Sequence, residues 1–365
     1  MTDFQRILAL YLDYAAGLRN KNRENEPTGR GAIELLRVDY WYEGLKQRTG
    51  LGSAYALELY FEKESFKRNA NGTIRHYRSK WSRYEQNTIS PKANTLAKVE
   101  KLSPGSTHEM NHPLWQIMKS VDNGKNTDFD EYFKTLSFDI QAVLFSGESI
   151  GISICSVREP VTQSLLDKLE RRAGLDALAC LIAIMLEAKE RQRRSLLSKV
   201  ELTLHNVLLM VAIELESRGI ANRLLDWIIR NILPLGLLPH LALWMTSNDY
   251  IHASAYLNLM VYQNPQRRGK CLAWKQRVKV MAQLVRGVMG FDVQHAMRPQ
   301  FELRTDIGEI PAELIREFEQ LTSLRTWGWT CILAGEVQPF PSTHNANSPA
   351  SPHRFGSDST ETEWH

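Results

Sequence analysis

Basic and aromatic side chains are interleaved along residues 62–101, and the chemistry that they offer is phosphate binding. The basic residues of this segment are Lys63, Lys67, Arg68, Arg75, Arg78, Lys80, Arg83, Lys92, Lys98 and Lys101. Four acids oppose these ten, so the segment carries a net charge of +6, whereas the whole chain carries only +4. Each phosphate that such a patch neutralises releases counterions, which favours binding. The segment therefore predicts contact with nucleic acid, although a solvated surface with aromatic anchors explains the same composition.

A second basic run covers residues 262–290 and contains no acid at all. Lys189, Arg191, Arg193 and Arg194 form a third group. A solvated helix face explains any one of these groups, but three of them in a nearly neutral chain favour localised binding of an anionic partner. The residues that we predict to bind nucleic acid are Lys67, Arg68, Arg75, Arg78, Lys80, Arg83, Lys92, Arg267, Arg268, Lys270, Lys275, Arg277 and Lys279.

The segment from His108 to His112, HEMNH, matches HExxH, the pattern of zinc proteases. That chemistry requires both histidines on one helical face as zinc ligands, with the glutamate as general base. Pro113 follows directly and biases His112 away from helical geometry. Ser106 and Glu109 fit a helix-capping box instead. We therefore predict no catalytic residue, no metal and no cofactor, and a zinc hydrolase stays a remote alternative.

The hydrophobic pattern that must position these groups is mostly helical. Apolar residues recur at helical spacing over residues 4–18, 33–47, 53–64, 128–145, 161–174, 176–200, 202–218, 221–232, 272–287 and 311–324. Asn71-Gly72 predicts a β-hairpin between basic flanks. Residues 149–157 alternate apolar and small side chains, as a strand does.

Residues 81–102 carry a recognisable arrangement of helix ends. Glu85, Asn87, Pro91 and Leu96 stand at the spacing found in the second half of lambda-repressor-like (XRE-type) helix-turn-helix domains. In that family a glutamate closes the third helix, a Gly or Asn makes a left-handed exit, and a proline opens the fourth helix. Residues 33–102 therefore resemble this DNA-binding family in part.

The resemblance implies that the helix beginning near Ser53, or the one through Trp81, lies in a major groove. Arg75, Arg78, Lys80 and Arg83 would then contact phosphates and base edges. The predicted hairpin stands where the family has a continuous recognition helix. A helix–turn–helix packing unit that binds no DNA explains the same pattern.

Residues 120–128, SVDNGKNTD, are polar and contain a glycine, which is typical of a linker. The predicted fold class is mostly α. We expect a basic helix-turn-helix-like module with a short β-hairpin over residues 1–119 and a larger helical domain over 129–336. A disordered tail rich in Pro, Ser and Thr is expected over 337–365.

The four cysteines are widely spaced, which is typical of reduced thiols in the cytoplasm. We expect no membrane partner, because no apolar run is long and clean enough to span a bilayer. Five tryptophans are predicted to lie in the core, Trp227, Trp244, Trp274, Trp327 and Trp329.

The predicted function is nucleic-acid binding without intrinsic catalysis, as a DNA-binding regulator or a subunit of a nucleoprotein complex, with DNA favoured over RNA. The alternative is a helical scaffold that binds an acidic protein partner or self-associates.

Overall fold

The computed structural model describes residues 31–72, 74–76, 79–150, 153–262 and 271–334. Within these ranges the fold is mostly helical, which confirms the predicted class. The predicted helix over 4–18, the predicted tail over 337–365 and the basic residues Arg78, Arg267, Arg268 and Lys270 lie outside the described residues.

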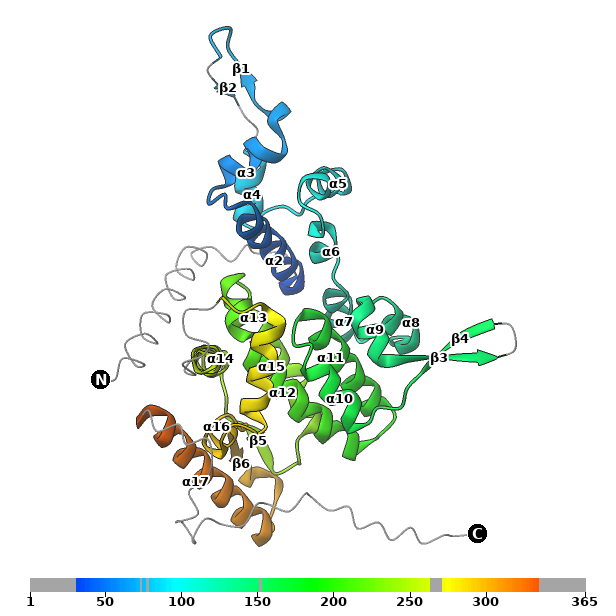
Figure 1. Cartoon of the computed structure of the whole chain (residues 1–365), viewed down its shortest axis with the longest axis vertical. Coiled ribbons are helices and arrows are strands. Elements are labelled where there is room, and N and C mark those ends of the chain that lie inside the picture. Colours follow the sequence, from blue (N-terminus) through cyan, green and yellow to red (C-terminus); the bar gives the residue numbers. More distant parts are fainter. Residues whose placement is uncertain (1–30, 73, 77–78, 151–152, 263–270, 335–365) are drawn as a thin grey trace.

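An N-terminal arm extends from one end of the molecule (Figure 1). Its elements are α2 (Ala32–Thr49), α3 (Ala54–Phe61), β1 (Lys67–Arg68), β2 (Ile74–His76), α4 (Lys80–Glu85), α5 (Ala93–Leu102) and α6 (Ser106–Met110). Strands β1 and β2 pair antiparallel. The helix ends follow local chemistry. Gly50 adopts φ 70° and closes α2, and the Ser53 side chain accepts a hydrogen bond from the Ala56 N–H at the start of α3.

Aromatic rings fill the core of the arm. Trp41 stacks on Trp81 with ring centroids 5.8 Å apart, and Phe61 also stacks on Trp81, at 5.1 Å. Tyr84 meets both indoles edge-on. Trp41, Trp81 and Tyr84 are fully buried. The helices of the arm are thus held around a small aromatic core, where such pairs add to the gain from area burial.

The body of the molecule is a larger helical assembly. Its helices are α7 (Pro113–Asp122), α8 (Phe129–Lys134), α9 (Phe138–Leu144), α10 (Gln163–Glu170), α11 (Leu175–Glu190), α12 (Arg194–Ser217), α13 (Ala221–Asn231), α14 (Ser247–Val261), α15 (Trp274–Val285), α16 (Phe291–Ala296) and α17 (Ala312–Ala334). Two antiparallel strand pairs accompany them, β3 (Phe145–Ile150) with β4 (Ser153–Arg158) and β5 (Leu241–Leu243) with β6 (Phe301–Leu303).

Helices α11 and α12 form the centre of the body and are buried along most of their length. By length and composition alone α12 could cross a membrane, but its apolar stretch is 72% buried within the fold. A buried core helix passes the same test of length and hydropathy.

Two sequence-based expectations about the body are wrong. The predicted break between helices near residue 201 lies instead at residues 191–193, where Gln192 adopts φ 55° without any glycine or proline to signal it. Trp244 and Trp327 are exposed, at 59% and 46% of their surface, rather than buried. Each lies at the periphery, Trp244 just after β5 and Trp327 on α17, whose buried residues are only Gly328 and Ile332.

The arm and the body share helix α2. Most of its apolar side chains, such as Trp41 and Leu45, belong to the aromatic core of the arm, whereas Ile33 and Leu36 belong to the core of the body. Polar contacts tie the two parts further. Arg223 of α13 pairs with Asp39 of α2, and the Gln47 amide of α2 donates to the carbonyl of Ser217 at the end of α12 at 2.9 Å. The arm is therefore anchored at its base by both packing and ion pairs.

Candidate nucleic-acid interface

The predicted basic residues of the arm separate into two kinds. Lys67, Arg83 and Lys92 are exposed, and none has an ion-pair partner in the part of the chain that the structure describes. Arg68 and Arg75 lie on β1 and β2, but their side chains are outside the described part. Lys80 belongs to the second kind, because it is committed to contacts within the fold.

Lys80 is enclosed by partners from two other segments of the arm. Its Nζ lies 3.0 Å from Glu62 Oε1 and donates to Thr95 Oγ1 at 2.6 Å. The Trp81 indole N–H donates to the second Glu62 oxygen at 3.2 Å. Glu62 is only 8% exposed, so Lys80 compensates a carboxylate that burial would otherwise penalise. Its charge therefore contributes less to an external field than the sequence count implies.

Helices α3 and α4 present few cations to a DNA groove. Helix α3, AYALELYF, contains no basic residue, and its exposed side chains include the rings of Tyr55 and Tyr60. Helix α4 has six residues, and after Lys80 is paired only Arg83 offers an exposed positive charge. Groove docking by one of these helices stays a prediction that rests on the sequence resemblance.

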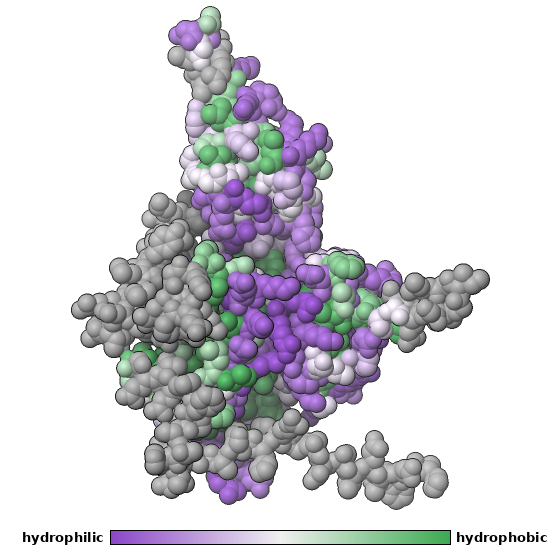
Figure 2. All heavy atoms as spheres, in the orientation of Figure 1, coloured by the Kyte–Doolittle hydropathy of each residue, from purple (hydrophilic) through white to green (hydrophobic). Residues whose placement is uncertain are grey.

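Helix α15 brings part of the second basic run beside helix α10. The Trp274 indole N–H at the start of α15 donates to the carbonyl of Ala173 at 2.8 Å, and Arg286 just past its end lies 2.8 Å from both Asp167 and Glu170 of α10. Figure 2 shows hydrophilic side chains gathered over the face where α10 and α15 appear in Figure 1. Two sequence segments 101 residues apart therefore build one surface.

Five basic residues on or next to these two helices are exposed, and we define them as the α10–α15 basic surface: Lys168, Arg171, Arg172, Lys275 and Lys279. None of them has a carboxylate within ion-pair distance among the residues that the structure describes. Sequence reasoning predicted Lys275 and Lys279 but missed the other three. Lys168, Arg171 and Arg172 are close in sequence to Asp167 and Glu170, so their local net charge looked unremarkable.

Arg277 and Arg286 form ion pairs with nearby acids, so these acids do not offset the positive charge of the α10–α15 basic surface. Arg286 binds Asp167 and Glu170, as described above, and thereby neutralises the two carboxylates nearest in sequence to Arg171. Arg277 lies over the Trp274 ring at 4.8 Å, donates to Asn258 at 3.0 Å and pairs with Glu214 at 2.9 Å. Arg277 was predicted to bind nucleic acid, but its described contacts are all within the fold.

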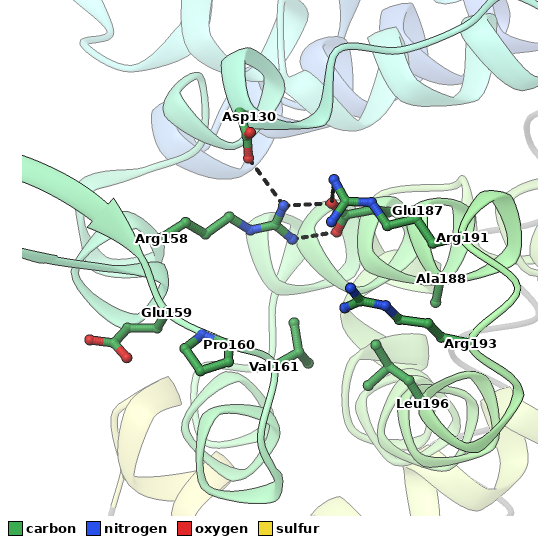
Figure 3. A pocket seen from close by; sticks show the side chains of 10 residues that line it. All are labelled: Asp130, Arg158, Glu159, Pro160, Val161, Glu187, Ala188, Arg191, Arg193 and Leu196. Atoms are coloured by element: carbon green, nitrogen blue, oxygen red, sulfur yellow. Dashed lines mark hydrogen bonds and ion pairs between the residues drawn. The ribbon is translucent and has the colours of Figure 1, made fainter. Parts of the chain in front are cut away.

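Two residues of the third basic group, Arg191 and Arg193, line a cavity of about 260 Å³ at the end of α11 (Figure 3). Arg158 of β4 points into it, contacts Asp130 at 3.1 Å, binds both oxygens of Glu187 and stacks on the Phe133 ring at 4.2 Å. Arg191 pairs with the same Glu187 at 2.9 Å. Burial would lower the pKa of Arg158, but its two acidic partners raise it. Arg158 and Arg191 are thus balanced by acids within the cavity, whereas Arg193 at its rim has no described ion-pair partner.

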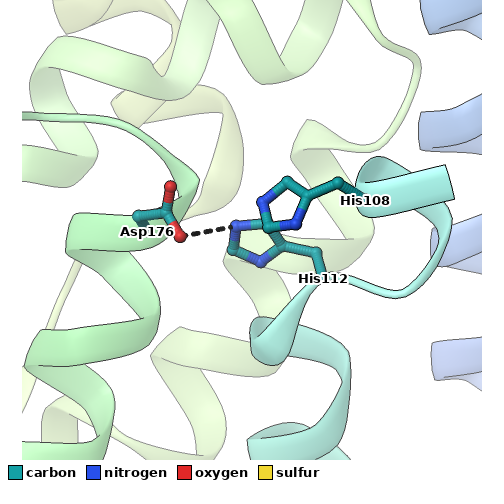
Figure 4. A group of neighbouring side chains, drawn as sticks. All are labelled: His108, His112 and Asp176. Atoms are coloured by element: carbon teal, nitrogen blue, oxygen red, sulfur yellow. Dashed lines mark ion pairs between the residues drawn. The ribbon is translucent and has the colours of Figure 1, made fainter. Parts of the chain in front are cut away.

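One group among the described residues has the donor set for a metal ion, namely His108, His112 and Asp176, whose ligand atoms lie within 4.8 Å of one another (Figure 4). The His112 Nδ1 accepts a hydrogen bond from the Leu114 N–H at 3.1 Å, because His112 caps helix α7. The proton of the neutral ring is therefore on Nε2, which lies 3.1 Å from Asp176 Oδ1. Burial raises the pKa of Asp176, but interactions with His112 outweigh it and the pKa lies below its usual value.

This proton arrangement does not suit a zinc ligand. A metal on Nε2 normally leaves the other ring nitrogen protonated and donating, whereas here that nitrogen accepts from the backbone. Glu109 is also unavailable as a general base. Its two oxygens accept from Arg48 at 2.6 and 2.8 Å, and Arg218 lies 3.3 Å away. The geometry instead makes His112 a link between α7 and α11.

Comparison of the chain with protein-family models, with curated proteins and with solved structures returned no match.

Proposed function

We propose that the protein binds nucleic acid through the phosphate backbone and catalyses no reaction on it. The observation that supports this best is the α10–α15 basic surface. Its five exposed cations belong to two segments that Trp274 and Arg286 join, and Arg286 neutralises Asp167 and Glu170 beside them. Phosphates attract such a surface because each neutralised charge releases a condensed counterion. We propose that lysine and arginine side chains on this face contact the phosphates and position the backbone rather than read sequence.

The arm supplies a second, separate set of exposed cations, Lys63, Lys67, Arg83 and Lys92. In Figure 1 the arm extends away from the body. A long polymer that spans both regions would gain binding free energy from the cations of each, and neither region would have to move toward the other. Duplex DNA is a stiff polymer that can span separated sites, and we favour it over RNA for this reason. The role that follows is a DNA-binding regulator or a subunit of a nucleoprotein complex.

The test is fluorescence-anisotropy binding of the full chain to duplex DNA, single-stranded DNA and RNA over a salt series. The key variant replaces Arg171, Arg172, Lys275 and Lys279 with glutamine. For duplex DNA the slope of log K against log salt should become shallower by about 0.9 for each phosphate that the variant no longer neutralises, so by up to about 4. The matched control replaces four other exposed cations with glutamine, Lys125, Lys134, Arg230 and Arg316, and so reaches the same net charge as the key variant.

Equal weakening by both variants would show that net charge rather than this surface matters, and would contradict the assignment. No binding of the unmodified protein at low salt would remove the function altogether. In that case an acidic protein partner becomes the better explanation of the exposed cations, because protein surfaces recognise such patches without counterion release on the same scale.

A further inference from the structure

A cavity of about 290 Å³ lies between helices α12, α14, α16 and α17, away from both basic regions described above. Its polar and aromatic lining is formed by His252 and Tyr256 of α14, Arg298 and Gln300 after α16, and Arg325 and Trp329 of α17. Leu209, Met245 and Met297 add apolar walls. A concave site with apolar walls and a few convergent polar groups is the usual form of a small-molecule site.

Two guanidinium groups in this cavity lack a carboxylate partner among the described residues. Arg325 Nε donates to the backbone carbonyl of Arg298 at 3.2 Å, and Arg298 makes no side-chain hydrogen bond or ion pair with any residue that the structure describes. The acid in the lining, Asp249, attracts Arg325 but forms no ion pair with it, and it also takes part in a helix cap. One of its oxygens accepts from the Thr246 N–H and hydroxyl at 2.8 Å each, as part of the cap of α14.

Both arginines are partly desolvated. Burial lowers the pKa of Arg298, and it lowers the pKa of Arg325 despite the opposing attraction of Asp249. Removing a cation from water without a partner costs free energy, so two partly buried guanidiniums in one cavity favour an anion that binds from outside. An anion placed between the two guanidiniums would supply the missing charge and several hydrogen bonds.

Aromatic rings define the second half of the site. Tyr256 and Trp329 meet edge to face with centroids 5.1 Å apart, and the Arg325 guanidinium lies 6.0 Å from the Trp329 ring centroid. The walls beside the two cations are therefore flat and apolar. They suit a planar ring that carries the anionic group, because such rings pack well against indole and phenol faces.

We propose that this cavity binds a small organic anion, in which a carboxylate or phosphate group on a planar ring is held by Arg298 and Arg325 while the ring packs beside Trp329 and Tyr256. The proposal is independent of nucleic-acid binding, because none of these residues belongs to either basic region.

Isothermal titration calorimetry on the full chain tests the site with four probes, which are phenyl phosphate, benzoate, phenol and inorganic phosphate. Binding of phenyl phosphate or benzoate, with phenol much weaker, supports the proposal, and the better of the two identifies the anionic group. Arg298→Gln and Arg325→Gln should each weaken binding by about 10- to 100-fold. Trp329→Leu should weaken the ring compounds but leave inorganic phosphate nearly unchanged.

Arg316→Gln is the matched control, because Arg316 is exposed on the same helix α17 and has no ion-pair partner among the described residues. It should bind the probes as the unmodified chain does. The midpoint of thermal unfolding should not fall in Arg298→Gln, since the replaced cation has no described partner to lose. Absence of binding by all four probes would overturn the proposal, as would equal weakening in Arg298→Gln and Arg316→Gln.

An acidic segment of the chain itself could occupy the cavity, and one more variant detects this. Replacing Asp358, Glu361 and Glu363 with their amides removes acids of the C-terminal segment. If the probes bind only after this change, the natural occupant is that segment and the small-molecule proposal is wrong. Equal probe binding before and after the change supports it.

Discussion

Arg218, at the end of α12, reaches Gly44 in the middle of α2, and the absence of a side chain at Gly44 lets its guanidinium approach Glu109. A Cβ at position 44 would overlap Arg218 Nη1 and lie 2.5 Å from Glu109 Oε2. Arg48 binds the same carboxylate through two hydrogen bonds. Three segments that are distant in sequence thus meet at Glu109, which joins the arm to the body.

Gly44→Ala should therefore destabilise the protein. Helix propensity alone predicts the opposite, since alanine stabilises a helix interior by about 1 kcal/mol relative to glycine. Displacing Arg218 from Glu109 and crowding the contact should cost about 1–3 kcal/mol and decide the sign. Urea unfolding measures the difference, and Gly52→Ala is the control, because a Cβ there meets nothing within 4 Å. A more stable Gly44→Ala variant would contradict this prediction, because it would show that Arg218 can move away from position 44 without lowering the stability of the protein.

Replacing Lys80 with alanine should lower stability rather than nucleic-acid affinity. The substitution leaves the buried side chain of Glu62 with only the Trp81 indole N–H as a described partner, which should cost about 1–3 kcal/mol. Arg83→Ala, on the exposed side of the same helix α4, should leave the unfolding midpoint nearly unchanged. Parallel measurement of urea unfolding and DNA binding separates the two roles. Weaker DNA binding by a Lys80→Ala variant of unchanged stability would contradict this assignment.

The charge pattern of the sequence predicted where cations are concentrated, but it could not predict which of them stay free. Lys80 is neutralised by Glu62 from 18 positions away, and Arg286 by Asp167 from 119 positions away. A count along the chain treats these charges as equal to those of Lys275 or Lys92. Only the fold distinguishes them, because pairing depends on which helices cross.

Periodicity predicted the helical class well and the helix ends less well. Residues 221–232 were predicted as a helix and are observed as Ala221–Asn231, since polar and apolar side chains alternate there with a clear helical period. The turn at Gln192 went unrecognised because a left-handed glutamine carries no sequence signal. The two arginines of the cavity between α12, α14, α16 and α17 were missed for a related reason, as Arg298 and Arg325 are 27 positions apart and unremarkable in sequence.

Substitutions at His112 should distinguish a helix cap from a metal ligand. Asparagine can still accept the Leu114 N–H, so His112→Asn removes only the interaction with Asp176. Alanine removes both, and should cost about 1 kcal/mol more than asparagine does. Urea unfolding compares them, and elemental analysis of purified protein should find no stoichiometric zinc. Bound zinc that disappears in both variants would contradict the assignment of His112 as a cap.

Glu201 should make the stability of the protein fall as the pH rises from about 4.5 to about 8. It lies on α12 with 7% of its surface exposed, and its Oε1 has no hydrogen-bond partner among the described residues. Burial raises the pKa of this carboxyl from 4.5 to about 8. Between these two values the folded state therefore keeps the proton on Glu201, whereas the unfolded state has already released it. The stability that this proton contributes is lost as the pH rises through that window.

Glu201→Gln removes this dependence, because the amide has nearly the same shape and never ionises. The variant should match the unmodified protein near pH 5 and exceed it at pH 9, with a ceiling of about 5 kcal/mol set by the difference between the two pKa values. His205, whose pKa burial lowers to about 4, affects both proteins alike below pH 6.5 and cancels in the comparison. Urea unfolding at pH 5, 7 and 9 measures the difference, with the exposed Glu190→Gln as control. A difference that stays constant from pH 5 to 9 would mean that Glu201 ionises freely in the folded state, so that water or a cation reaches its carboxylate inside the body.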